Sequence, residues 1–352
     1  MQVLLKLFRD TYSKVSNFIH DAIWQEKLDF NNIATDNQRD AAEYLQTSDL
    51  LHLAMASKTH RPLFMPLVDV RKLLHCVVRG QYEKVKSILQ NDISLIFQRG
   101  SVTDCSGRSF DNISAIEYVL WAKDKHMWTC MLDCLPKNEE GKKVLTRLLS
   151  QYNKVQTEGV TYRFNGKIIT EINFDFENTI IKELQELVDL INAPGDKNWD
   201  AINEQWRTKV GGAQKLLPIH VVNEYRSDQP FSPEVPQFTS PPEVVRPCYN
   251  EITRSYDDWD EIYRGLAVDF ALYKGPDEWG TCSKSAGGFR NNLVLRLSRL
   301  TADLAALKEL WEVRTQNVIN FKSQLEELIA DINSQLIKCE QLDSMSMNTP
   351  AA

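Results

Sequence analysis

Cysteines and histidines are the residues of this chain that could supply nucleophilic or metal chemistry. The seven cysteines are odd in number and follow no regular spacing. This pattern is typical of reduced thiols in a cytosol-like compartment and not of a disulfide framework. A catalytic thiol must be exposed and must have a lowered pKa. The candidates for a Cys/His catalytic site are Cys76, Cys105, Cys282, His126 and His220.

One short spacing could bring metal ligands onto a single helix face. Cys130 and Cys134 lie one helical turn apart and could form such a face with His126. Zinc sites normally take four ligands, and no second pair of cysteines or histidines follows at a suitable spacing. A core or half-buried helix face is therefore the favoured interpretation, and we predict neither a metal nor another cofactor.

The stretch around His220 offers a second arrangement. His220 and Glu224 are four residues apart, so a helix would place them on one face, but the second histidine of a zinc-protease helix is missing. A Cys-His-Asn hydrolase could use His220 with Asn223 and a remote cysteine, yet nothing in the sequence positions that cysteine. A histidine hydrogen-bonded near Pro218 is the simpler interpretation, and we assign no catalytic residue.

Composition and charge narrow the class of protein. The chain has 352 residues, with 43% hydrophobic and 25% charged residues, as in ordinary globular proteins. Its net charge of −7 argues against nucleic-acid binding, which usually needs a basic patch. The sequence has no apolar stretch long enough for a transmembrane segment, and its first residues do not resemble a cleaved signal peptide.

The spacing of apolar residues predicts a mostly α-helical fold with one small β-hairpin. Asn165-Gly166 lies between two short runs of β-forming residues, which is the strongest local signal for a hairpin. The predicted segments are an amphipathic N-terminal helix (1–30), short helices (31–68 and 69–137), a middle helical region with the hairpin near 160–170 (138–226), a proline-rich strap (227–250), an aromatic and acidic region (251–290), a long C-terminal helix (291–342) and a disordered tail (343–352).

Residues 31–68 resemble the second half of an F-box, the helical motif that docks onto the Skp adaptor of a cullin ubiquitin ligase. Asn37 and Gln38 stand where that motif has two apolar residues, and Ile33, Ala34 and Asp36 stand where it has Leu-Pro and an acid. An ordinary helical hairpin is the alternative interpretation. The residues that carry the resemblance are Leu45, Asp49, Leu50, Leu51, Leu53, Ser57, Lys58, Leu63 and Phe64.

Residues 69–137 resemble two degenerate ankyrin repeats. A helical face of Leu73, Leu74, Val77 and Val78 ends at Gly80, and a second helix follows. The stretches 104–107 and 114–116 resemble the tight turn and first-helix entry of the next repeat, after a connection from Arg99 to Ile113 that is longer than the consensus. Isolated repeats cannot bury their apolar faces, so we expect neighbouring helices to cover these two.

Together these features resemble a family of effector-like proteins of intracellular bacteria, which a type IV secretion system delivers into host cells. The resemblance covers roughly residues 30–240 and implies a secreted protein of the host cytoplasm whose partners are host proteins, including a Skp-type adaptor. It lends no established activity. On this basis we expect Leu45, Leu50, Leu51, Leu53 and Leu63 to help dock the adaptor.

Trp121 and Trp128 are seven residues apart and share a helical face with His126 nearby. An aromatic stripe at this spacing is usually part of a core, but tryptophan is also favoured at binding hot spots. Trp121, His126 and Trp128 are therefore further candidates for partner binding.

The long C-terminal helix has apolar residues at spacings of three, four and seven, as in a coiled coil. We assign Lys308, Arg314 and Lys322 to its outer positions. The stripe could pair within the chain or mediate self-association through residues 293–342. The leading hypothesis is a non-enzymatic protein-binding effector and ubiquitin-ligase adaptor. The alternatives are a host-directed enzyme with a Cys/His site and a structural coiled-coil scaffold.

Overall fold

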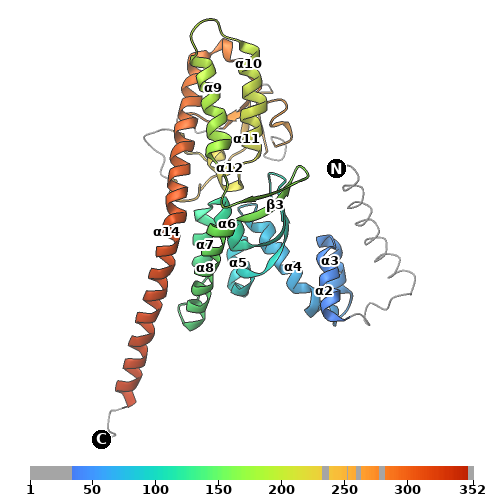
Figure 1. The fold of residues 1–352 in the computed structure, drawn as a ribbon, viewed down its shortest axis with the longest axis vertical. Coiled ribbons are helices and arrows are strands. Elements are labelled where there is room, and N and C mark those ends of the chain that lie inside the picture. The colour runs from blue at the N-terminus through green and yellow to red at the C-terminus, as the bar shows by residue number, and fades with distance from the viewer. Residues whose placement is uncertain (1–33, 232–237, 252, 259–262, 277–281, 348–352) are drawn as a thin grey trace, which may run out of the picture. The chain divides into compact units, whose positions relative to one another are not determined.

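The computed structural model describes residues 34–231, 238–251, 253–258, 263–276 and 282–347, with side chains as far as residue 335. The chain divides into two compact units, Met1–Arg71 and Lys72–Ala352, which we describe separately. Figure 1 confirms the predicted fold class in its main features, because helices dominate and a long C-terminal helix is present. The predicted N-terminal amphipathic helix (1–30) lies outside the described residues.

The first unit consists of short helices around a small apolar core. Helices α2 (Thr35–Glu43) and α3 (Thr47–Ala56) precede α4 (His60–Val77), of which the residues up to Arg71 belong to this unit. The Arg71 side chain donates hydrogen bonds of 2.6 Å to the carbonyl oxygens of Glu43 and Leu45, and so satisfies carbonyl groups where α2 ends. The buried core residues are Ala42, Leu50, Ala54, Phe64 and Val68.

The second unit begins with two pairs of helices separated by a β-hairpin. The end of α4 turns through Gly80, whose positive φ of 63° suits glycine, into α5 (Tyr82–Asn91) and a short 3-10 turn, Ile93–Phe97. Strands β1 (Arg99–Thr103) and β2 (Ser109–Ser114) follow. Helix α6 (Ala115–Ala122) then starts with a capping box of Ser114 and Glu117, and α7 (Lys125–Leu132) follows.

The predicted hairpin belongs to a larger sheet than the sequence indicated. Asn165 and Gly166 have positive φ angles and join β3 (Val160–Phe164) to β4 (Lys167–Glu171), which confirms this turn. The stretch from Arg99 to Ile113, expected as a connection, supplies most of β1 and β2, and all strands pair antiparallel in the order β1-β2-β3-β4. Pairing with β2 stabilises a hairpin that would be marginal alone.

A continuous helical rod covers residues 199–215. It comprises α10 (Trp199–Glu204), a π-helical stretch (Gln205–Val210) and α11 (Gly211–Lys215). Glycine disfavours a helix interior, yet Gly211 and Gly212 continue this rod. A β-carbon on Gly211 would lie 2.8 Å from the Phe270 carbonyl oxygen and 2.9 Å from the Ala267 nitrogen, so glycine is needed here for close packing.

Gly211→Ala is therefore expected to destabilise the protein by about 1–3 kcal/mol, because the added methyl group meets backbone atoms that cannot move aside. Gly212→Ala is the matched control. Its β-carbon would meet only the Ala267 side chain, at 3.8 Å, and alanine favours a helix by about 1 kcal/mol over glycine. Urea unfolding followed by circular dichroism measures both changes, and equal stability of the two variants would contradict the close-packing explanation.

A second sheet, which the sequence analysis did not predict, lies within residues 248–285. Its short strands are β5 (Cys248–Asn250), β6 (Ser255–Asp257), β7 (Ala271–Tyr273) and β8 (Ser283–Ser285), in the order β6-β5-β8-β7. The buried Gln214 side chain pairs with the backbone of Leu272 through two hydrogen bonds, of 2.6 and 2.8 Å. This amide takes the place of a further strand and closes the β7 edge.

Helix α14 (Leu293–Met347) is the long helix against which other helices of the second unit pack. Figure 1 shows it beside α9 (Lys182–Asn192) at one end and beside α8 (Glu139–Glu158) further along, and both helices contact it. Its apolar stripe is thus covered within the chain at Leu300, Leu307, Phe321 and Leu325. This packing leaves that part of the stripe no free face for self-association, and the helix runs past residue 342 into the expected disordered tail.

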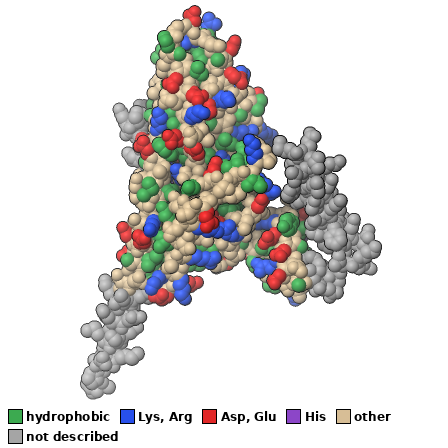
Figure 2. Space-filling model, viewed as in Figure 1, with side chains coloured by type: hydrophobic (Ala, Val, Ile, Leu, Met, Phe, Trp, Pro, Cys, Tyr) green, Lys and Arg blue, Asp and Glu red, His purple; other side chains and the backbone are tan. Residues whose placement is uncertain are grey.

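The remaining helical segments of the second unit are a π-helical turn before α9 (Glu177–Ile181), α12 (Ile219–Arg226) and a 3-10 turn before α14 (Phe289–Asn291). Figure 2 shows basic and acidic side chains interspersed over the face of this unit in view. Across the described ranges, every helix is too short or too polar to span a bilayer.

Candidate functional site

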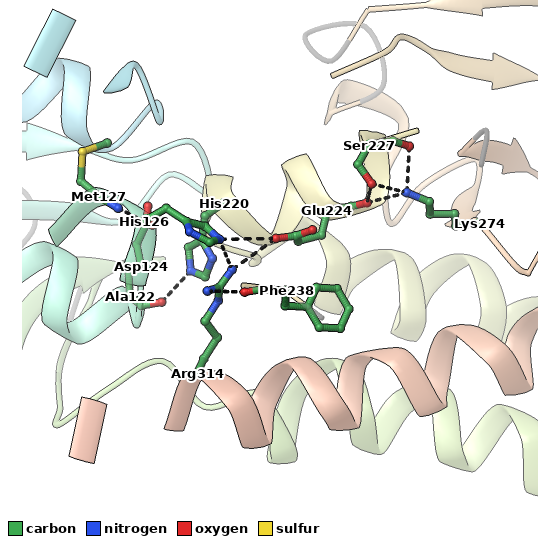
Figure 3. Close-up of polar contacts among 10 residues, drawn as sticks. All are labelled: Ala122, Asp124, His126, Met127, His220, Glu224, Ser227, Phe238, Lys274 and Arg314. Carbon is green, nitrogen blue, oxygen red and sulfur yellow. Dashed lines mark hydrogen bonds and ion pairs between the residues drawn. The ribbon is translucent and has the colours of Figure 1, made fainter. Parts of the chain in front are cut away.

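A cluster of buried charged groups joins α7, α12 and α14 (Figure 3). Asp124 caps the N-terminus of α7 by accepting a hydrogen bond from the Met127 amide, which places His126 in the first helical turn. Helix α12 starts after Pro218 and presents His220 and Glu224 one turn apart. Helices α7 and α12 therefore position the side chains that Arg314 of α14 contacts.

Arg314 is at the centre of this cluster and is fully buried. Its Nη2 lies 2.6 Å from Nε2 of His126 and 3.2 Å from Oε1 of Glu224, while its Nη1 donates to the Phe238 carbonyl oxygen at 3.1 Å. One guanidinium group therefore ties α14 to α7, to α12 and to the strap. Such a fork of fixed donors is characteristic of arginine and cannot be reproduced by lysine.

The protonation states in the cluster follow from burial and neighbouring charge. Burial, together with the charge of Arg314, lowers the pKa of His126 to about 2, so this ring is neutral and its Nε2 accepts a hydrogen bond from Arg314. Burial raises the pKa of Glu224 to about 7, although Arg314 and Lys274 oppose that rise. Glu224 is thus a carboxyl group that titrates near neutral pH, whereas Arg314 keeps its charge.

Lys274 closes the far end of the cluster. Its Nζ donates to the carbonyl oxygens of Glu224 (2.7 Å) and Ser227 (2.8 Å) and to the Ser227 hydroxyl (2.6 Å). The ammonium group thereby caps the C-terminal end of α12, where the helix dipole favours a cation. Burial lowers the pKa of Lys274 to about 8. Asp303 on α14 accepts hydrogen bonds from the backbone amides of Lys274 and Gly275.

His220 is used for packing between helices. It is buried, and its Nε2 lies 2.7 Å from the carbonyl oxygen of Ala122, which joins α12 to the end of α6. The simpler interpretation of His220 as a hydrogen-bonded histidine near Pro218 agrees with this geometry.

Two of the three candidate thiols of the enzyme hypothesis, Cys76 and Cys282, are not activated. Burial raises the pKa values of Cys76 and Cys282 above the ordinary thiol range, so both are protonated at neutral pH. Cys130 and Cys134 donate weak hydrogen bonds to backbone carbonyl oxygens, and His126 faces Arg314, so this trio does not converge on a metal. Within the described ranges, no group of three or more ligand side chains could hold a metal ion.

Trp121, Trp128 and His126 lie inside the second unit. Trp121 is fully buried among Phe110, Tyr118, Tyr162 and Phe174, with ring centroids 5.3–6.1 Å from its own. Trp128 packs against Phe321 of α14 at 5.2 Å. The expected partner-facing role of these three residues does not fit the structure, because their side chains form the core and the buried cluster.

The predicted docking leucines differ in how far they are exposed to solvent. Leu50 is fully buried, while Leu45, Leu53 and Leu63 pack half-buried against the first unit's core. Leu51 is 40% exposed. Of the predicted set, the structure therefore leaves only Leu51 facing mainly outward.

Arg314, Lys274 and Asp303 were not predicted as site residues, and Arg314 was assigned to the outside of its helix. The position of Arg314 in its helix, and not its residue type, indicates that it is buried. The buried residues Leu307, Leu310, Val318 and Phe321 recur on α14 at spacings of three and four, and Arg314 occupies a position in the same stripe. A single charged residue within an apolar stripe indicates a buried partner.

Two comparisons with known proteins identify relatives of this chain. Residues 179–325, which include α12, Lys274 and Arg314, match the family described as the CBUA0006 C-terminal domain. No solved structure matches the chain. The curated "Uncharacterized protein CBUA0006" of Coxiella burnetii is 34% identical over 270 residues, which cover 71% of this chain and 73% of that protein. The chain therefore belongs to the CBUA0006 family.

Proposed function

We propose that this protein is a non-enzymatic, protein-binding effector that an intracellular bacterium delivers into the host cytoplasm by type IV secretion. In its sharper form, the first unit docks onto the Skp-type adaptor of a host cullin ubiquitin ligase. The F-box-like residues support the proposed binding to the adaptor. The relative from Coxiella burnetii, an intracellular bacterium, supports the proposed delivery into a host cell.

One observation carries the docking proposal: the two sides of α3 differ sharply in exposure. Leu50 and Ala54 are fully buried, whereas Leu51 is 40% and Met55 is 61% exposed. Leu51 and Met55 are four residues apart and therefore neighbours on the helix surface. Paired apolar side chains that do not contribute to the core are typical of a protein-docking surface.

Two departures from the F-box motif take different places in the structure. Gln38 is 7% exposed and so fills a largely buried position, while Asn37 is exposed on α2. Because Asn37 offers no apolar side chain to an adaptor, the proposal assigns most of the docking energy to α3 and not to α2.

The helix pairs of the second unit support the ankyrin-like part of the resemblance, but the first helix of the second pair, α6, is enclosed. Every residue of α6 is buried, because the first sheet, α7 and α8 pack around it. We therefore assign the client to other surfaces of the second unit and not to Trp121 or Trp128.

Direct binding of the purified full-length protein to a purified Skp adaptor tests the proposal. Leu51→Asp with Met55→Asp is expected to weaken adaptor binding at least tenfold, because two charged groups would have to be desolvated at the contact. Both side chains are outward-facing, so the circular-dichroism spectrum and melting temperature should change little. Biolayer interferometry with immobilised adaptor measures the affinity.

Val294→Asp with Ile319→Asp is the matched control, since these residues are also apolar and exposed on a helix, at 84% and 57%. This control should bind the adaptor like the wild type. Absence of adaptor binding by the folded wild type would refute the ligase role, and undiminished binding by the α3 variant would exclude α3 as the docking surface.

A further inference from the structure

A cavity of about 290 Å³ lies where α12 ends and the proline-rich strap begins. Glu224 and Ser227 of α12 contribute to its wall, together with strap residues that include Phe231 and Phe238. This volume is at the lower end of the range for small-molecule sites. It suits one side chain or a small ligand, and it excludes a nucleotide-sized group.

A buried carboxyl group forms part of the cavity wall. Glu224 is 5% exposed, and its Oε1 accepts a hydrogen bond from Arg314. Among the described residues, Oε2 has no hydrogen-bond or ion-pair partner. In Figure 3 one oxygen of Glu224 meets Arg314, whereas its second oxygen is drawn without a contact. A carboxylate oxygen that reaches a cavity and lacks a protein donor can accept a hydrogen bond from a ligand.

The charged side chains on the described wall of the cavity are carboxylates, while Arg314, Lys274 and Arg246 lie behind this wall and contact its residues. The described wall contains three carboxylates, Glu224, Asp228 and Glu243, and no lysine or arginine. Asp228 lies 3.8 Å from Arg246, while Glu243 is exposed and has no ion-pair partner within the described ranges. The wall therefore offers carboxylate oxygens to a ligand that donates hydrogen bonds, and Glu243 is the wall carboxylate whose charge no described cation offsets.

The aromatic walls fit the same ligand class. Phe231 already accepts one cation, because Lys274 Nζ lies 4.8 Å from its ring centroid. Phe238 packs edge-on against Phe231, with ring centroids 6.3 Å apart. A ring face beside a carboxylate is the arrangement by which proteins bind ammonium and guanidinium groups.

We propose that this cavity binds the guanidinium or ammonium head of an organic cation, with Glu224 accepting its hydrogen bond and Phe238 contacting its apolar part. The head group comes from a basic side chain of a partner protein or from a free amine. This site is independent of the docking surface on α3, so either assignment can fail alone.

Isothermal titration calorimetry of the full-length protein tests this site with defined probes. Nα-acetyl-arginine amide carries a single guanidinium charge, and Nα-acetyl-citrulline amide is its neutral counterpart. We expect saturable binding of the arginine probe and at least tenfold weaker binding of the citrulline probe. The arginine probe should also bind about tenfold more tightly at pH 8 than at pH 6, because Glu224 titrates near pH 7 and the guanidinium group stays charged.

Two variants distinguish binding in the cavity from nonspecific attraction of a cation to an acidic protein. Glu243→Gln should weaken the arginine probe at least threefold, while Glu140→Gln, which removes an exposed carboxylate on α8, should leave binding unchanged. Glu224→Gln should abolish binding, but it also alters the contact with Arg314, so the exposed Glu243 provides the decisive variant if Glu224→Gln fails to fold.

Agmatine distinguishes the two sources of the ligand. Tighter binding of agmatine than of the blocked arginine supports a free amine, and the reverse order supports a partner's side chain. The proposal is overturned if the arginine and citrulline probes bind equally, if neither saturates, or if binding of the arginine probe is unaffected by both pH and Glu243→Gln.

Discussion

Replacing Arg314 with methionine is expected to destabilise the second unit by about 3–5 kcal/mol, because it leaves the buried Glu224 without its cationic partner. The same change removes the donor to His126 and to the Phe238 carbonyl oxygen. It therefore releases α14 from three elements at once. Urea unfolding followed by tryptophan fluorescence measures the loss, since Trp121, Trp128 and Trp206 are buried in this unit.

Two further variants show whether this loss comes from an unpaired charge. Lys322→Met removes an exposed cation from the same helix, and its effect should stay within about 0.5 kcal/mol. Adding Glu224→Gln to Arg314→Met should restore about 2 kcal/mol, because an uncharged side chain costs less to bury than an unpaired carboxylate. A loss below about 1 kcal/mol for Arg314→Met alone would show that the cluster does not hold α14.

The stability that the neutral His126 contributes is expected to be lost in mild acid. Its pKa falls from an ordinary 6.5 to about 2 in the folded state. Below pH 6.5 the unfolded chain therefore binds a proton that the folded chain rejects, so this contribution to stability is complete above pH 6.5 and is lost as the pH falls. From pH 7 to pH 5 the loss amounts to about 2 kcal/mol.

His126→Gln isolates this effect, because glutamine offers an acceptor to Arg314 and does not titrate. The comparison is needed because burial raises the pKa values of Glu224 and Asp303 to about 7. Their contributions to stability therefore grow as the pH falls, by about 2 kcal/mol each between pH 7 and pH 5, and together outweigh the loss from His126. The difference in unfolding free energy between wild type and His126→Gln should shift by about 2 kcal/mol between pH 7 and pH 5. Parallel pH profiles would mean that His126 is protonated in the folded protein.

Local signals predicted the helices and the hairpin turn, but not the features that depend on distant parts of the chain. Asn165-Gly166 carries its turn preference in two adjacent residues. By contrast, β5 and β8 are three residues long, and β5 pairs in parallel with a strand from a remote stretch, so neither has a periodic pattern that could be recognised. The second sheet therefore had no sequence signature.

Gly211 and Arg314 show why residue type alone does not determine where a side chain lies. Glycine disfavours a helix interior, because propensity reflects the local backbone, whereas Gly211 is needed where its helix meets the backbone of Ala267 and Phe270. Arginine was assigned to the surface, whereas Arg314 meets a glutamate and a histidine from two other helices. In both cases the deciding neighbour is far away in the sequence.

The packing of α14 against α8 also has a kinetic consequence. The buried residues Leu145, Leu148, Tyr152 and Val155 of α8 are synthesised long before α14, the helix that packs beside them. Contacts between such distant segments are slow to form, because the intervening chain must first be brought together. The nascent protein therefore remains only partly folded until α14 has left the ribosome, and a chain interrupted before Leu293 exposes an apolar surface that chaperones recognise.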